Sequence, residues 1–302
     1  MGKSSGIRYA GYIISSEYLP SWLRNVVIVN MQKNTVKKIR KWLIIVIVLY
    51  VAIGTALYFL QEKILFHPQE IAAGDNYNFS APFKEINLPV NNKKNLNIIQ
   101  FTVPDSACNG VVLYFHGNRN NIQRYAPYAS NFTKNNYEVW MVDYPGFGKS
   151  TGKRSEQIMY NDAAILYQMA RGRFSKDSIL IYGRSIGTGV AAQLASVKDC
   201  KRLILETPYY SIDALMRHYA FIYPVSRMAK YHFPNHTYFK KIEVPVTLFH
   251  GTNDEIIPYG HSVKLAKENT SVNLVTIEKG KHNNLNDFPL FHQQLDSLLQ
   301  LP

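Results

Sequence analysis

The sequence predicts an alpha/beta fold: an eight-stranded, mostly parallel sheet with helices on both faces, preceded by one transmembrane helix. Three observations lead to this prediction. In the C-terminal two-thirds of the chain, short apolar runs alternate with helix-like segments, which is typical of a buried parallel sheet. An uncharged apolar stretch long enough to cross a bilayer comes before them. Of the 302 residues, 46% are hydrophobic and only 18% charged, which excludes a disordered chain.

The apolar stretch covers residues 42–60. At about 1.5 Å per residue, a helix of this length spans roughly 28 Å, close to the hydrocarbon thickness of a bilayer. A cleaved signal peptide is the alternative, since residues 54–56 (Gly-Thr-Ala) resemble a cleavage site. The apolar run continues past that site, however, which favours an uncleaved anchor in the membrane bilayer. The mean hydropathy of −0.17 excludes a multi-span membrane protein.

Basic residues are concentrated before the apolar stretch. The formal net charge is +13, and the basic N-terminal segment 1–41 holds eight Lys and Arg side chains against one acid. The positive-inside rule therefore predicts a cytoplasmic N-terminus and a single-pass protein whose remaining chain lies on the outer, periplasmic or lumenal, side. This placement explains the charge, so no nucleic-acid partner is expected. Residues 1–30 are a candidate upstream extension of the reading frame, and we assign them no function.

Residues 62–302 are predicted to form one domain. Its strands are expected at residues 84–90, 96–103, 111–116, 139–143, 179–182, 203–206, 246–250 and 274–277. Helical patterns lie at residues 122–132, 155–169, 186–195, 260–267 and 287–299. The turn between the first two strands is too short for a crossover helix, so these two are expected to be antiparallel. An insert rich in Tyr and Phe occupies about 207–243.

The most specific motif is G-x-S-x-G at residues 183–187, between a predicted strand and a predicted helix. In that context the chain turns so sharply that the serine backbone is strained and its hydroxyl stands out at the edge of the sheet. Gly183 and Gly187 allow the close packing of this elbow. The motif therefore predicts Ser185 as a nucleophile.

A serine hydroxyl needs a base to take its proton and an acid to orient that base. Asp254 follows the strand 246–250, and His282 follows the last strand, so the chain order is serine, acid, histidine. Glu255 stays open as an alternative orienting acid. The other histidines are expected to be structural: His250 is expected to pack, and His261 is expected at the surface.

The third strand ends at His116-Gly117-Asn118, where one donor of an oxyanion hole is expected. We predict the backbone amides of Asn118 and Ile186 as the two donors, with His116 and Gly117 supporting the loop.

Residues 143–150 resemble the end of a phosphate-binding loop. The position where that motif requires its first glycine is occupied by Asp143, however, so a structural loop is expected. His232 and His236 have helical metal-ligand spacing but Pro234 lies between them, and no metal is expected. The two cysteines, Cys108 and Cys200, also lack metal-site spacing and are expected to be unremarkable thiols, while a disulfide between them in an oxidising compartment stays open.

These motifs together resemble the alpha/beta-hydrolase superfamily. More closely, they resemble its serine-aminopeptidase-like branch with a single N-terminal membrane helix, which is related to eukaryotic membrane-bound acyl-protein thioesterases and lysophospholipases. The resemblance rests on residues 116–118, 143–152, 183–189, 250–254 and 280–282. It implies Ser185 as nucleophile, Asp254 as acid and His282 as base, in agreement with the chain order.

The resemblance also implies that the insert at about 207–243 is a short cap over the active site. The expected activity is hydrolysis of carboxylic esters or thioesters through an acyl-enzyme, without a cofactor, on a small-molecule or lipid acyl substrate. An aminopeptidase-like amide hydrolase and a catalytically silent binding module are the alternatives. The aromatic residues of the insert either line an acyl-chain site or pack the cap on the sheet. The sequence predicts neither the natural substrate nor the oligomeric state.

Overall fold

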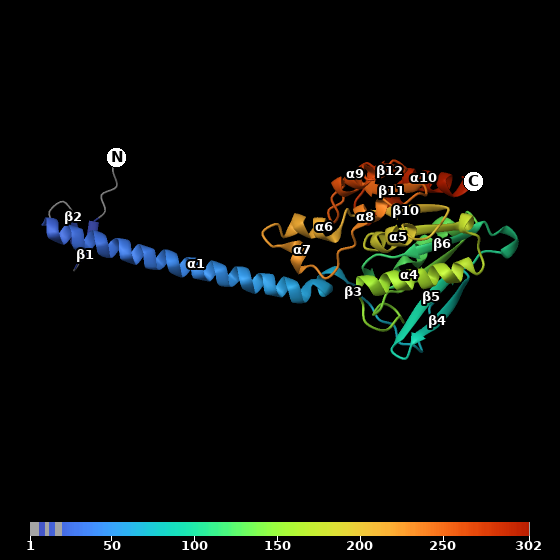
Figure 1. Cartoon of the computed structure of the whole chain (residues 1–302), viewed down its shortest axis with the longest axis horizontal. Helices are drawn as coiled ribbons and strands as arrows, with labels where there is room; N and C mark the ends of the chain where they lie inside the picture. Colours follow the sequence, from blue (N-terminus) through green and yellow to red (C-terminus); the bar gives the residue numbers. More distant parts are fainter. Residues whose placement is uncertain (1–5, 10–11, 16–19, 302) are drawn as a thin grey trace. The chain divides into compact units, whose positions relative to one another are not determined.

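The computed structural model describes residues 6–9, 12–15 and 20–301 (Figure 1). The chain divides into two compact units, Met1–Leu60 and Gln61–Pro302. Because residues 1–5, 10–11 and 16–19 are not described, part of the predicted basic segment 1–41 and of the candidate extension 1–30 lies outside the described residues.

The first unit holds a short antiparallel pair, β1 (Gly6–Tyr9) with β2 (Tyr12–Ser15), and most of helix α1 (Ser21–Leu65). Within α1, residues Gln32–Leu65 contain an 18-residue stretch of mean hydropathy 2.7 whose side chains are almost all exposed. By length and composition this helix could cross a membrane or serve as a signal segment. The helix is longer than the predicted span 42–60, because the Lys and Arg residues before it are also good helix formers.

The second unit is built on one eight-stranded sheet with the order β12-β11-β10-β9-β6-β8-β5-β4. The strands are β4 (Phe83–Asn91), β5 (Lys94–Phe101), β6 (Gly110–Phe115), β8 (Tyr137–Val142), β9 (Ile179–Arg184), β10 (Arg202–Glu206), β11 (Val246–Gly251) and β12 (Val272–Ile277). Strand β5 pairs antiparallel with β4 and β8, and the other pairs are parallel. The predicted fold class is confirmed.

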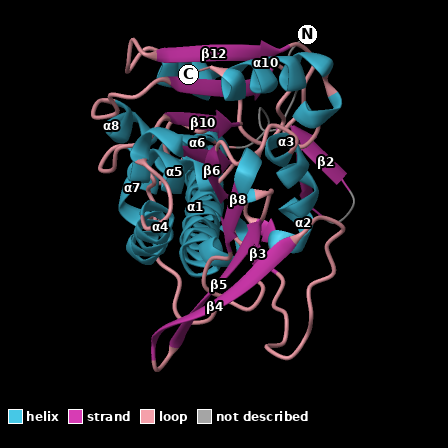
Figure 2. Ribbon diagram, turned by 90° about the vertical axis from the view of Figure 1, so that its right-hand side faces the viewer, coloured by secondary structure: helices cyan, strands magenta, loops and turns pink. Residues whose placement is uncertain are grey.

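Helices cover both faces of the sheet (Figure 2). One face carries α4 (Glu156–Arg171), α5 (Gly187–Ala195) and α9 (Gly260–Ala266), and the other carries α2 (Ile122–Tyr125), α3 (Ser130–Thr133) and α10 (Pro289–Gln300). The single helix expected over 122–132 is instead interrupted by the 3-10 turn Ala126–Ala129. Pro127 is the second residue of that turn, and a proline lacks the N–H that would continue the helix α2.

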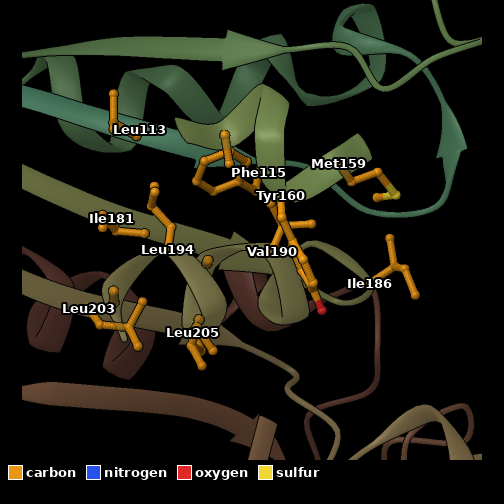
Figure 3. Packing of buried hydrophobic residues seen from close by; sticks show 14 of the residues in the cluster. Leu113, Phe115, Met159, Tyr160, Ile181, Ile186, Val190, Leu194, Leu203 and Leu205 are labelled. Atoms are coloured by element: carbon orange, nitrogen blue, oxygen red, sulfur yellow. The ribbon is translucent and has the colours of Figure 1, made fainter. Parts of the chain in front are cut away.

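The central strands are buried on both faces, which explains their continuous apolar runs. In β6, Leu113 belongs to the core beneath α5, whereas its neighbour Val112 belongs to the core beneath α10. Val190 and Leu194 of α5 lie in the same core as Leu113 (Figure 3). This packing holds α5, and with it the residues just before it, rigidly on the sheet.

The insert at about 207–243, called the cap below, contains α6 (Ile212–Tyr219), α7 (Val225–Met228) and α8 (Asn235–Phe239). Four of its aromatic side chains are buried in the core beside α4 and α5: Tyr209, Tyr231, Phe233 and Phe239. For these four, the interpretation that aromatic residues pack the cap on the body therefore holds. Elsewhere the short strand β3 (His67–Pro68) pairs with β7 (Arg119–Asn120), and both cysteines are free thiols.

Candidate active site

Ser185 lies between the end of β9 and the first turn of α5, with a φ of 52°. This left-handed conformation is strained for a residue with a Cβ and must be held by its surroundings. The Ser185 amide donates to the carbonyl of Glu206 at 3.0 Å, and the Ser185 carbonyl accepts from the Thr188 hydroxyl at 2.7 Å. The serine backbone is thus fixed from both sides.

Two glycines allow the elbow to pack. A Cβ at Gly183 would come within 2.7 Å of the Ala191 Cβ, and one at Gly187 would come within 2.2 Å of the Phe115 carbonyl oxygen. Because real Cβ atoms do not approach that closely, only glycine brings α5 this near to β6 and β9. The sequence motif predicted both close approaches.

A hydrogen-bonded chain joins the three predicted triad residues. The Ser185 Oγ lies 3.0 Å from His282 Nε2, and His282 Nδ1 lies 2.8 Å from Asp254 Oδ2. With the carboxylate at Nδ1, the proton of a neutral imidazole resides on Nδ1 and leaves Nε2 free to accept the serine proton. The arrangement is that of a nucleophile, a base and an orienting acid.

The structure distinguishes Asp254 from Glu255, the two candidate acids for orienting His282. Asp254 contacts the His282 ring, whereas the carboxylate of Glu255 lies 3.5 Å from the His282 backbone amide. The second carboxylate oxygen of Asp254 accepts from the amides of Ile256 (2.9 Å) and Ile257 (2.7 Å), which fixes its orientation. Asp254 is therefore the acid that faces the imidazole.

A contact that the sequence did not predict is made by His250. Its Nε2 lies 3.1 Å from Asp254 Oδ2, and its Nδ1 lies 2.6 Å from the Ser262 hydroxyl. Burial alone would raise the pKa of Asp254, but hydrogen bonds from His250 and His282 outweigh it and hold the pKa well below its ordinary value. The acid therefore remains ionised at neutral pH. His250 was expected only to pack against its neighbours. Its position four residues before Asp254 is the sequence feature that could have indicated this contact.

The predicted oxyanion donors lie on two adjoining segments. Within the described part of the chain, neither the Ile186 amide nor the Asn118 amide donates to another protein group. A Cβ at Gly187 would reach within 2.6 Å of the His116 carbonyl oxygen, so the loop 116–118 lies against the start of α5. Free amides near the N-terminus of a helix favour developing negative charge.

Contacts from neighbouring segments hold the loop 116–118 in place. The Tyr144 hydroxyl donates to the His116 carbonyl at 2.9 Å, and the Asn118 carbonyl accepts from the His67 amide at 2.8 Å. The buried Asp143 carboxylate lies 3.2 Å from His116 Nε2 and accepts from the Ile122 amide at 3.0 Å. Burial raises the pKa of Asp143, and the neighbouring His116 opposes this rise. The segment after β8 thus braces the loop 116–118.

The remaining histidines lie in other contacts. His232 Nδ1 lies 2.9 Å from a carboxylate oxygen of Asp213, and His236 stacks on Tyr210. His261 was expected at the surface, but it is half-buried and accepts a hydrogen bond from the Tyr210 amide at 3.0 Å. In the described ranges no group of three or more His, Cys, Asp or Glu side chains is arranged to hold a metal ion.

Comparison with known proteins finds sequences similar to this chain. The family model described as serine aminopeptidase, S33, matches residues 106–238. Alpha/beta hydrolase domain-containing protein 17C of Xenopus tropicalis is 32% identical over 195 residues, which are 63% of this chain and 60% of the relative. The human protein of the same name is also 32% identical, over 56% of its length. Residues 106–238 of this chain are thus similar to that family, and the chain has the alpha/beta-hydrolase fold.

Solved structures of the same fold are similar to this chain. The esterase Pf2001 of Pyrococcus furiosus superposes with a TM-score of 0.57 at 21% identity, covering 78% of this chain and 98% of the esterase. Est1E of Butyrivibrio proteoclasticus has a TM-score of 0.57 at 16% identity, covering 71% and 97%. Both structures are under 25% identical to this chain, so they show that it has the alpha/beta-hydrolase fold. The chain matches less than two thirds of the length of the curated relatives named above.

Proposed function

We propose that this protein is a membrane-anchored serine hydrolase that cleaves carboxylic esters or thioesters through an acyl-enzyme. One observation supports the proposal above all: an unbroken hydrogen-bonded chain from the Ser185 hydroxyl through His282 to Asp254. A strained serine beside an oriented imidazole is the arrangement that activates a hydroxyl for attack on a carbonyl carbon.

The proposed reaction has two halves. Ser185 Oγ bonds to the substrate carbonyl carbon while its proton moves to His282 Nε2, and the amides of Ile186 and Asn118 hold the oxyanion. His282 then gives that proton to the leaving alcohol or thiol, and the acyl-enzyme remains. Water attacks the acyl carbon as His282 takes its proton, and His282 then gives that proton to Ser185 Oγ as the bond to the acyl group breaks and the carboxylic acid leaves. Each oxyanion donor contributes a factor of about 10² to 10³ in rate.

The membrane part of the proposal rests on the apolar helix. Residues 42–60 would hold the chain in the bilayer, with the N-terminus cytoplasmic and the catalytic unit on the outer side, because the basic residues precede the apolar stretch. Resistance to carbonate extraction tests the anchor. Protease accessibility in intact cells tests the orientation, and digestion of residues 62–302 only after lysis would contradict it.

Amide hydrolysis is a second candidate, because the matching family model is that of a serine aminopeptidase. Such an enzyme needs a carboxylate to bind the substrate amine. In the cap region Glu156 accepts from the His232 amide and from the Tyr160 hydroxyl, and Asp213 contacts the His232 ring. Both carboxylates therefore have structural partners, which favours esters or thioesters over amino-acid amides.

Reaction with a fluorophosphonate probe tests the nucleophile. We expect Ser185 to be labelled, and Ser185→Ala to lose both labelling and ester hydrolysis while keeping the unfolding temperature. Labelling that persists in Ser185→Ala would refute the assignment. A series of esters, thioesters and amino-acid amides on the purified chain then ranks the substrate classes. Faster cleavage of the amides would favour the aminopeptidase.

A further inference from the structure

The end of α6, the turn that follows it and α7 form an exposed apolar tip on the cap. We call this segment, residues 217–230, the cap tip. Tyr219, Phe221 and Ile222 are 60%, 78% and 57% exposed, and they lie within four consecutive residues. In the described part of the second unit, other large apolar side chains with such exposure are spread singly over the surface. A contiguous apolar group of this kind indicates an interaction site rather than an ordinary surface.

The charge of the cap tip has one sign. Arg217, Arg227 and Lys230 are exposed, and no Asp or Glu occurs anywhere in residues 214–242. Apolar side chains flanked by Lys and Arg, without carboxylates, are the composition of segments that lie in the interface of a bilayer. A purely apolar partner surface would not require these cations.

The cap tip is tied to the residue that directly follows the apolar run of α1. The buried Gln61 side chain donates to the Met228 carbonyl at 3.1 Å and accepts from the Lys230 amide at 2.7 Å. All three residues belong to the second unit, in which α6 and α7 project beyond the layered body (Figure 1). If residues 42–60 span the bilayer, Gln61 lies at its boundary with water, and the cap tip lies there too.

The cap tip is also hydrogen-bonded to the loop that holds Asp254. The Tyr219 hydroxyl, at the end of α6, donates to the Ile256 carbonyl at 2.8 Å, two residues after Asp254. A lipid surface that contacts the cap tip would therefore lie next to the loop that carries the acid of the triad.

We propose that the cap tip docks on the surface of the lipid bilayer, with Phe221 and Ile222 among the acyl chains and Arg217, Arg227 and Lys230 at the phosphate headgroups. This inference rests on the membrane-anchor part of the proposed function. It defines how the catalytic unit is oriented: its cap faces the lipid, so that a lipophilic ester can enter from the bilayer.

A fluorescent label at position 221 tests the docking in the full-length chain. Cys108→Ser serves as background, since burial raises the pKa of the remaining Cys200 thiol to about 12 and makes it slow to react. Phe221→Cys is labelled with the dye NBD and reconstituted into phosphatidylcholine vesicles, with or without phosphatidylglycerol. Val197→Cys is the control, because Val197 is likewise an exposed apolar residue, at 57% against 78% for Phe221, but lies beyond α5.

We expect the label at 221 to shift to the blue and to be quenched by lipids that carry a nitroxide on the acyl chain, while the label at 197 is not. Equal quenching at both positions, or none at 221, would overturn the inference. A blue shift at 221 without lipid quenching, growing with the protein-to-lipid ratio, would instead indicate a second copy of the chain and also overturn it.

Activity on the same vesicles separates this inference from the proposed function. Phe221→Ser with Ile222→Ser is expected to keep hydrolysis of a soluble p-nitrophenyl ester and to lower hydrolysis of a vesicle-embedded ester at least about fivefold. An unchanged rate on the embedded ester would count against docking. Failure of the wild-type chain to cleave any ester would count against the hydrolase proposal, while the quenching result would still decide the docking.

Discussion

His250 Nε2 and His282 Nδ1 both lie within hydrogen-bond distance of one oxygen of Asp254, at 3.1 Å and 2.8 Å. The His250 Nε2 also faces the Ile257 carbonyl at 2.8 Å, so this nitrogen carries a proton, and Nδ1 lies 2.6 Å from the Ser262 hydroxyl. A buried imidazole thus supplies a second N–H to the carboxylate that faces His282. The acid of the candidate triad is held by histidines on two sides.

Replacing His250 is expected to change the pH profile of hydrolysis. In His250→Gln the carboxylate loses an aligned donor, so more of its charge is available to a protonated His282. We therefore expect kcat to fall about tenfold and the acidic limb of the kcat/KM profile to move to higher pH. The measurement is ester hydrolysis against pH. A variant that loses activity at all pH values without a moved limb would assign His250 a purely structural role.

His292→Gln is the matched control for that measurement. His292 lies in α10, and its ring contacts the Asn286 carbonyl at 2.7 Å, away from the three triad side chains. Its pH profile should coincide with that of the wild-type chain.

Gly187→Ala is expected to damage the site more than the fold. The new Cβ would lie 2.2 Å from the Phe115 carbonyl oxygen and 2.6 Å from that of His116. Either α5 or the loop 116–118 must move, at a cost of about 1–3 kcal/mol in the free energy of unfolding. Because that movement displaces the oxyanion donors, we expect a loss of at least about 10²-fold in kcat.

Gly260→Ala, at the start of α9, is the control for Gly187→Ala. A Cβ there would meet nothing within 4 Å, so stability should stay equal or rise by up to about 1 kcal/mol. Thermal unfolding and ester hydrolysis of both variants decide the matter. Wild-type activity in Gly187→Ala would show that the close approach at this position is not required.

His261 is expected to make the stability of the protein depend on pH. Burial, and to a lesser extent the nearby Lys264, lowers the pKa of His261 from its ordinary 6.5 to about 4. Between these two values the unfolded chain binds a proton that the folded chain does not. The free energy of unfolding therefore falls as the pH decreases from about 6.5 to about 4, and His261 causes no further loss below that.

The test is thermal unfolding of the detergent-solubilised chain across that pH range. In His261→Asn the side-chain oxygen can still accept from the Tyr210 amide, but nothing titrates at this position. The difference in unfolding temperature between the variant and the wild type should thus grow in favour of the variant as the pH falls. Two parallel curves would contradict the prediction.

Sequence alone determined the features that depend on local pattern and chain order. The apolar runs predicted all eight strands of the sheet, and the uncharged stretch 42–60 predicted the long apolar helix. G-x-S-x-G between a strand and a helix led to Ser185, and the order of the later loops led to Asp254 and His282. These features follow from periodicity and from the rule that loops after parallel strands gather at one sheet edge.

Tertiary structure decided what depends on contacts between distant segments. The break at Pro127 reflects a local proline, but the roles of His250, Asp143 and Gln61 arise only when separate loops come together. Whether a cap aromatic is buried like Phe233 or exposed like Phe221 depends on which surface faces α5, and composition does not encode this. The chain order therefore led to the three triad side chains, while the residues that hold them in position were visible only in three dimensions.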